Sequence, residues 1–333
     1  MEKLSISLTP DMAAAVRQAV DSGDYESRAD NSNCLRRLGF QARGNSGART
    51  HIGSSRQGAP MMAWTPEQRR RYAPAIEHAV RSHAIVRLAA AIDMIDPPAR
   101  TGRPRLWSTL LMLQALWWLC RAGSAWKLLP GLYPPRQTIG SRLERWRRLE
   151  VLERALAVLN GCLRLARGRR RRPSAGILDT QSVRTGPQAG PRGYDAGKKV
   201  NGRKRVLLVD TEGLVQAIRV VPASVQDRDT PAVLEPELAS SSLRKVWADL
   251  AFNGAAAAPM TRCGIELELV GRKNKTGFEV EPRRWKVEQT FGILVRYRRL
   301  QVDHEGSTIM SRMMTLLAAL FTSANRFERQ VMA

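Results

Sequence analysis

Residues 176–183 read GILDTQSV, residues 203–210 read RKRVLLVD, and residues 214–224 read LVQAIRVVPAS. Apolar runs of this length, bounded by turn residues, are typical of buried strands. The turn DTEG at residues 210–213 joins the second run to the third as a hairpin. These stretches therefore predict three antiparallel strands at the start of a sheet.

The residues that follow predict that this sheet is of the mixed α/β class. We expect a helix over roughly 228–239, a strand in LRKVWADLAF at 243–252 and another in IELELVGRK at 265–273. A helix in RRWKVEQTFGILVRYRRL at 283–300 and a methionine-rich helix at 307–327 complete the series. A helical crossover after the hairpin makes the first and fourth strands neighbours in the sheet.

Three carboxylates fall on these predicted elements, namely Asp179 on the first strand, Asp249 on the fourth strand and Glu288 on the helix. Neighbouring strands set the two aspartates side by side, and the helix can lay Glu288 across them. Mg²⁺ prefers such hard oxygen ligands, and two metal ions can drive phosphodiester cleavage. The chain has 30 acidic residues, so a turn or helix-cap role stays open for each of the three.

The charge of the chain points to a polyanionic partner. Lysine and arginine number 54 against 30 acidic residues, a net charge of +24, and DNA or RNA is the first candidate. The longest apolar run, 107–120, is too short to span a bilayer, so we expect no membrane association. The four cysteines form no CxxC pair, which favours a cytoplasmic protein with reduced thiols over a disulfide scaffold or a zinc site.

Basic residues gather in several segments that could hold DNA. A short helix at 124–129 and a basic helix at 137–149 are compatible with a helix-turn-helix. Five arginines within 167–172 form either a solvated linker or a phosphate-neutralising stripe. The candidate DNA-binding residues are Arg142, Arg145, Arg169, Arg170, Lys198, Lys199, Arg203, Lys204, Arg205, Arg284, Arg296 and Arg298. A solvated surface is the alternative for each of them.

Changes in composition divide the chain into five stretches. Residues 1–30 are acidic on balance, whereas residues 31–60 hold five arginines and no acidic residue. The predicted parts are a truncated strand–helix unit at 1–30, a disordered junction at 31–61, an all-helical DNA-binding domain at 62–166, a basic linker at 167–173 and a catalytic domain at 174–330.

The text around the three carboxylates resembles the DDE transposases of bacterial insertion sequences, specifically the "insertion sequence five" family. The matching pieces are LDTQSVRTGPQ (178–188), GYDAGKKVNGRKRVLLVDTEGL (193–214), PASVQDRD (222–229), VWAD (246–249) and PRRWKVEQTFGILVRYRRL (282–300). The segment at 102–135 also resembles the helical domain that precedes the catalytic core in this family. The resemblance extends over roughly residues 64–327.

This resemblance implies a ribonuclease H-like core in which Asp179, Asp249 and Glu288 are the catalytic, metal-binding triad. It implies Mg²⁺ as the cofactor, for which Mn²⁺ can substitute, and strand cleavage at the ends of the element followed by strand transfer into target DNA. It also implies a homodimer or higher multimer on DNA, in the cytoplasm and associated with the bacterial nucleoid. Asp210 lies in matching text but off the triad, and we interpret it as a turn residue.

Three positions depart from the family pattern. Leu250 follows the second aspartate, where the family usually has small residues, and could crowd a metal site. Glu281 and Val295 stand where related transposases have a tyrosine and a lysine. A catalytically impaired protein that still binds DNA is therefore the alternative to an active transposase.

The start of the chain resembles another family. SISLTPDMAAAVRQAVDSGDYES (5–27) is similar to the first strand and helix of ParD-like ribbon-helix-helix antitoxins, and the match stops there. An insertion of the element into an antitoxin gene would explain this arrangement, with Met61 or Met62 as the native start. An antitoxin-like regulator acting through residues 1–27 is the third functional hypothesis.

Overall fold

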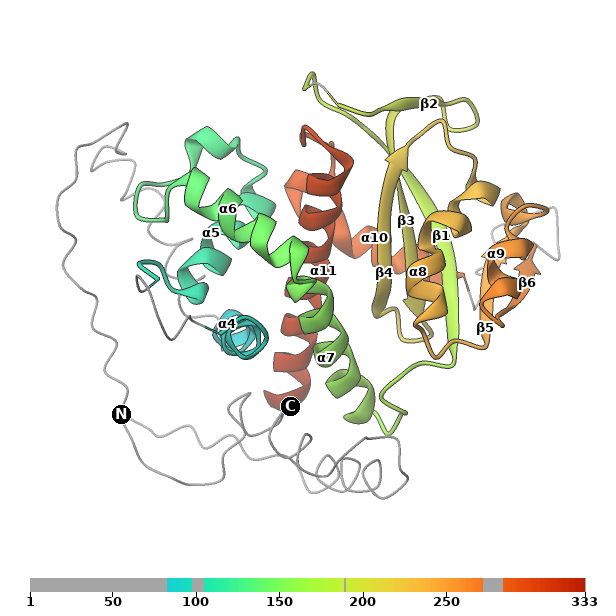
Figure 1. Cartoon of the computed structure of the whole chain (residues 1–333), viewed down its shortest axis with the longest axis horizontal. Coiled ribbons are helices and arrows are strands. Elements are labelled where there is room, and N and C mark those ends of the chain that lie inside the picture. The colour runs from blue at the N-terminus through green and yellow to red at the C-terminus, as the bar shows by residue number, and fades with distance from the viewer. Residues whose placement is uncertain (1–82, 98–104, 189, 272–283, 333) are drawn as a thin grey trace.

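The computed structural model describes residues 83–97, 105–188, 190–271 and 284–332 (Figure 1). The antitoxin-like unit predicted at 1–30, the junction predicted at 31–61 and the start of the predicted helical domain lie outside these described residues. Within the described ranges, no helix combines the length and the apolar character needed to cross a bilayer.

In the residues that the structure describes, four α-helices and a short 3₁₀ helix precede the sheet. They are α4 (His83–Ile95), α5 (Thr109–Ala122), η1 (Trp126–Leu128), α6 (Arg136–Arg148) and α7 (Val151–Leu165). Helix α5 begins where the hydroxyl of Ser108 accepts a hydrogen bond from the Leu111 N–H. It ends at Gly123, whose φ of 67° is the left-handed conformation that glycine adopts readily.

The sheet is mixed, as the sequence predicted. Its strands are β1 (Ala175–Arg184), β2 (Gly193–Asp195), β3 (Val200–Asp210), β4 (Val215–Pro222), β5 (Lys245–Asp249) and β6 (Glu266–Val270). Their order is β2-β3-β1-β5-β6, and β4 also pairs with β3. The β1–β3 and β3–β4 pairs are antiparallel, whereas β1–β5 and β5–β6 are parallel. The prediction that the first and fourth predicted strands are neighbours is confirmed; strand β2 was not predicted.

Short helices cover one face of the sheet, and their residues form a separate apolar cluster with Leu178 and Val206. These helices are η2 (Asp227–Leu234), α8 (Glu235–Ala239), η3 (Leu250–Phe252) and α9 (Ala257–Arg262). The single helix predicted over 228–239 is therefore a 3₁₀ helix followed by one α-helical turn. Pro231 lies inside the 3₁₀ part and has no backbone N–H to donate, which disfavours a continuous α-helix.

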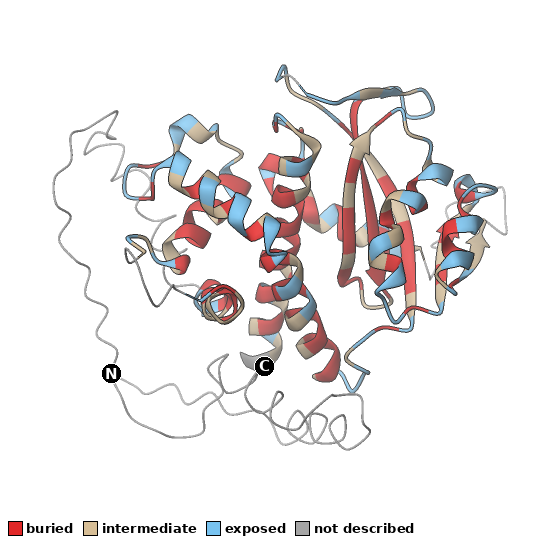
Figure 2. Ribbon diagram, in the orientation of Figure 1, coloured by how far each residue is buried: buried red, intermediate tan, exposed pale blue. Residues whose placement is uncertain are grey.

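The other face of the sheet carries α10 (Trp285–Leu294), the 3₁₀ helix η4 (Arg298–Leu300) and α11 (Thr308–Met332). Helix α11 lies between the sheet and the preceding helices (Figure 1). Buried residues line α11 on both sides (Figure 2), and one apolar cluster runs from Ile92 of α4 through Leu317 of α11 to Leu207 of β3. The helical region and the sheet thus share one hydrophobic core across the predicted linker at 167–173.

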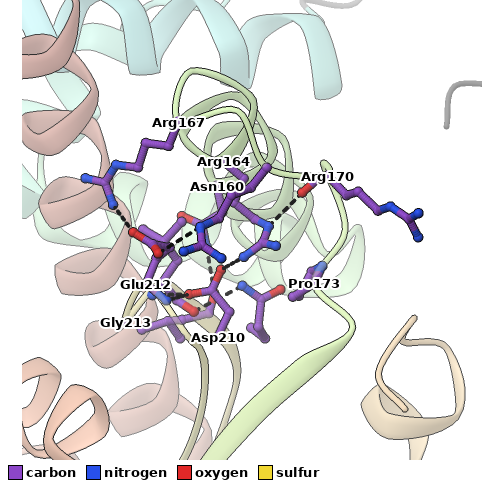
Figure 3. Close-up of polar contacts among 12 residues, drawn as sticks. Asn160, Arg164, Arg167, Arg170, Pro173, Asp210, Glu212 and Gly213 are labelled. Atoms are coloured by element: carbon purple, nitrogen blue, oxygen red, sulfur yellow. Dashed lines mark hydrogen bonds and ion pairs between the residues drawn. The ribbon is translucent and has the colours of Figure 1, made fainter. Parts of the chain in front are cut away.

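A buried ion pair joins these two parts of the core. The Nη1 atom of Arg164, near the end of α7, lies 2.5 Å from Oδ2 of Asp210, at the end of β3 (Figure 3). The other carboxylate oxygen of Asp210 accepts hydrogen bonds from the N–H groups of Glu212 and Leu214. The interpretation of Asp210 as a turn residue is confirmed, and its partner Arg164 was not foreseen.

Asp210→Ala is expected to lower the free energy of unfolding by about 3–5 kcal/mol, because it leaves the guanidinium of Arg164 buried without its counter-charge. Arg167→Ala is the matched control, because it removes a more exposed ion pair of the same region, with Glu212, worth less than about 1 kcal/mol. Urea unfolding followed by circular dichroism measures both. Equal losses for the two variants would contradict a structural role for the buried pair.

Candidate active site

Asp179 and Asp249 lie next to each other at the centre of the sheet. The parallel ladder of β1 and β5 pairs Ala175 with Lys245 and Ile177 with Trp247. Asp179 and Asp249 each lie two residues beyond the last of these pairs, so the two aspartates are at equivalent positions along their strands. Side chains alternate between the two faces of a strand, so both carboxylates lie on the face that carries Ile177 and Trp247. This is the face covered by α10 and α11.

Glu288 approaches from that same face. It lies in the first turn of α10, which packs against β1, and its side chain is 56% exposed. Arg284, at the beginning of α10, stands between two of the carboxylates. Its Nη2 atom lies 3.6 Å from Oδ2 of Asp249 and 3.5 Å from Oε1 of Glu288. Arg284 therefore lies within ion-pair distance of Asp249 and Glu288, and its charge also acts on Asp179.

The carboxyl group of Asp179 has an unusual environment. Its pKa is raised from 3.8 to about 6; burial is the largest cause, and the neighbouring Asp249 carboxylate also raises the pKa. A hydrogen bond from the Thr180 N–H, at 2.7 Å, and the charges of Arg284 and Lys198 lower the pKa in part. The net rise shows that the protein groups around Asp179 compensate its negative charge incompletely, and raised carboxyl pKa values are frequent at functional sites.

Lys198 approaches the site from the loop between β2 and β3. Its Nζ atom lies 3.4 Å from both the carbonyl oxygen and the hydroxyl of Thr180, the residue after Asp179. It also forms an ion pair with Asp227 at 3.7 Å. Lys199, the next residue, is exposed and has a φ of 53°. The two predicted lysines thus lie in the turn beside the carboxylates.

The donor set of this site fits a hard divalent cation, because it consists of carboxylate oxygens and includes the incompletely compensated Asp179. In the part of the chain that the structure describes, no three His, Cys, Asp or Glu side chains lie close enough together to form a complete metal-binding cluster. The positive group close to both Asp249 and Glu288 is the guanidinium of Arg284.

Leu250, the residue after Asp249, packs against a glycine that follows strand β6. Leu250 is 61% exposed and begins the short helix η3, which Asp249 caps by accepting a hydrogen bond from the Ala251 N–H at 2.8 Å. Its side chain lies over Gly271, after β6, where a Cβ would be 2.8 Å from the Leu250 Cδ1. Sequence reasoning missed this contact, although a glycine directly after a strand was a visible signal. The absence of a side chain at Gly271 provides the space that Leu250 occupies.

Three of the predicted DNA-binding residues are inside the protein. Arg203, Lys204 and Arg205 of β3 are 1%, 3% and 1% exposed. Arg203 pairs with Asp303, Lys204 pairs with Asp227, and Arg205 donates to the Leu300 carbonyl. These contacts hold η2, η4 and the segment before α11 against the sheet, so the three side chains are not available to DNA in this structure.

The other predicted basic residues lie nearer the surface. Arg145 of α6 binds Asp96 at 2.8 Å and so attaches α6 to the end of α4, and Arg169 forms an ion pair with Glu212 at 3.0 Å. The remaining members are the partly buried Arg142 and the exposed Arg170, Arg296 and Arg298. They lie in different parts of the fold, so the sequence-predicted set does not form one patch.

Two family models match parts of this chain. Residues 170–322 match the transposase DDE domain, and residues 87–156 match a family of transposases of the IS4/5 type. No curated protein matches the chain. The mixed sheet and the match to the DDE domain both fit a ribonuclease H-like core.

Asp179→Asn is expected to stabilise the metal-free protein at pH 8. The pKa of Asp179 is about 6 in the folded protein and 3.8 in the unfolded chain, so the folded state binds more protons between these values. The parent protein therefore loses stability as the pH rises from about 4 through 6, by up to about 3 kcal/mol. The variant lacks this loss.

Urea unfolding in EDTA at several pH values measures the difference between variant and parent. Asp229→Asn, at the exposed start of η2, is the matched control for the change from carboxylate to amide. A stability difference that stays constant from pH 5 to pH 8 would contradict the raised pKa.

Proposed function

Since this chain is a DDE transposase of the IS4/5 family, we propose that it binds the ends of an insertion sequence and catalyses metal-dependent strand cleavage and strand transfer. The observation that carries the proposal is the juxtaposition of Asp179 and Asp249 on neighbouring parallel strands, facing the helix of Glu288. These three carboxylates would hold the divalent metal, for which we propose Mg²⁺, with Mn²⁺ as a substitute.

The chemistry is hydrolysis of a phosphodiester bond in the cleavage step and exchange of one phosphodiester bond for another in the transfer step. In cleavage, water attacks the phosphorus atom and the 3′ oxygen leaves with a proton. In transfer, that 3′ hydroxyl attacks a phosphodiester of the target, forms a new phosphodiester bond and displaces the target's own 3′ oxygen, which leaves with a proton. The divalent metal, when bound, would act as a Lewis acid that makes the attacking oxygen more nucleophilic and stabilises the charge on the leaving oxygen. The protein contributes the position of its carboxylates, which the register of β1 and β5 sets.

Arg284 has a separate part in this proposal. Its guanidinium lies within 3.6 Å of Asp249 and 3.5 Å of Glu288, so it holds the two carboxylates near each other when DNA is not bound. An arginine at this position can also donate to a phosphate oxygen in bidentate geometry. We propose that Arg284 orients the carboxylates and contacts the phosphodiester of the bound DNA.

The exposed basic residues near the surface would contact the DNA backbone. We propose Lys199, Arg170 and Arg298 for this role, since each is exposed and of the charge that phosphate requires. The contact of α6 with a DNA groove, through Arg142 or Arg145, is part of the same proposal. Action as a homodimer or higher multimer rests on the family resemblance alone.

Asp249→Asn is expected to reduce Mg²⁺-dependent nicking of a labelled duplex carrying the element's own end by at least about 100-fold, because it removes a metal ligand. Binding of that duplex should persist, because the basic residues are unchanged. Gel analysis of nicked product and fluorescence anisotropy measure the two effects. Asp229→Asn is the control, because its carboxylate lies on the exposed start of η2.

Leu250→Gly tests the impaired alternative in the same assay. An active parent protein is expected to cleave as well as this variant, since Leu250 rests against Gly271. A parent that binds the duplex without cleaving it, in Mg²⁺ and in Mn²⁺, would contradict the proposed function. Cleavage gained only in Leu250→Gly would identify the leucine as the cause.

A further inference from the structure

A basic cavity lies on the side of α11 that faces α5 and the end of α10. Its volume is about 720 Å³, and its wall includes Arg121, Arg296, Arg326 and Arg329 together with a single acidic residue, Glu328. Helices α5, α10 and α11 are neighbours in the fold (Figure 1). We call this space the arginine cavity.

The wall that α11 contributes is one continuous face of the helix. Thr322, Asn325, Arg326 and Arg329 line the cavity and are spaced by three or four residues, which places them in one stripe. Burial is the main cause that lowers the pKa of Arg326, and the charge of Arg167 lowers it further. An anion in the cavity would offset this cost, because it stabilises the charged guanidinium.

The opposite wall is held in position by specific contacts. Arg121, at the end of α5, donates to the carbonyl oxygen of Arg296 at 3.3 Å. Its guanidinium also lies over the ring of Tyr297, 5.5 Å from the ring centroid. On the α11 wall, Arg326 donates to the carbonyl oxygen of Gly213 at 3.2 Å. Two of the four arginines are thus oriented before any ligand binds, which reduces the entropy lost on binding.

The position of the arginine cavity relates it to the carboxylates. Glu288 lies in the first turn of α10, and Arg296 follows the end of the same helix. Six residues of helix separate Glu288 from Leu294 and span about 9 Å, and Arg296 lies two residues further along, which gives a separation of roughly 12 Å. A DNA strand rises about 3.4 Å per nucleotide, so this distance corresponds to three or four nucleotides.

We propose that the arginine cavity binds the phosphate backbone of DNA, three or four nucleotides away from the phosphodiester that reaches Asp179, Asp249 and Glu288. This inference rests on the proposed function and assigns Arg121, Arg326 and Arg329 a role that the sequence alone did not suggest. The cavity recognises charge and shape, so it holds DNA without regard to base sequence.

The test replaces two of the three exposed arginines of the cavity in the full-length chain, as the double variant Arg296→Gln/Arg329→Gln. Anisotropy of a labelled duplex of about 30 base pairs is measured as a function of salt concentration. Loss of two phosphate contacts is expected to lower the slope of log K against log salt by roughly 1 to 2 and to weaken binding uniformly across sequences.

Two matched controls separate charge at this place from charge in general. Arg296→Lys/Arg329→Lys keeps both positive charges and should retain most of the slope. Arg154→Gln/Arg244→Gln removes two exposed arginines, one on α7 and one before β5, and should leave the slope within about 0.5 of the parent value. Thermal melting confirms that each variant is folded.

An unchanged slope in folded Arg296→Gln/Arg329→Gln overturns the inference. Stabilisation by inorganic phosphate that depends on these arginines, combined with an unchanged slope for DNA, also overturns it and assigns the cavity to a free anion. The nicking assay with Asp249→Asn is run in parallel. A parent that cleaves DNA while the slope stays unchanged refutes only the cavity, whereas a reduced slope without cleavage by the parent refutes only the proposed enzyme activity.

Discussion

The structure depends on the buried ion pair of Arg164 and Asp210, which ties the last helix before the sheet to the hairpin turn inside it. A charged pair in such a place is expensive to desolvate, so each partner requires the other. The pair is supported by Asn160, which donates to the Val215 carbonyl and accepts from the Ser323 hydroxyl. These contacts connect α7, the β3–β4 hairpin and α11, the same elements that share the larger hydrophobic core.

The same packing determines where the three carboxylates lie. Helices α10 and α11 pack on the sheet face that belongs to the shared hydrophobic core. This face carries Asp179 and Asp249. Glu288 then arrives on the first turn of α10, accompanied by Arg284 one turn earlier. The burial that raises the pKa of Asp179 is therefore a result of the same packing that joins the two parts of the chain.

Net charge alone overstates the surface available to DNA. Arg203, Arg205 and Arg299 are among the most buried polar residues, and they hold the chain after α10 through Asp303, the Leu300 carbonyl and Glu305. Arginine serves this purpose because its planar group makes several hydrogen bonds at once. The arginine cavity, in contrast, gathers residues from α5, α10 and α11 that no sequence segment groups together.

The sequence by itself determined five of the six described strands, most described helices, and the triad Asp179, Asp249 and Glu288 as a candidate site, because hydrophobic period, turn residues and family motifs are local. The mixed sheet and the β1–β5 pairing were also predictable, because crossover connections obey few rules. Only the tertiary structure decided which arginines are interior, that Leu250 lies over Gly271, and where the arginine cavity forms. These features depend on contacts between residues far apart in the chain. The identity of an arginine in the sequence does not reveal whether it pairs with a buried aspartate or faces solvent.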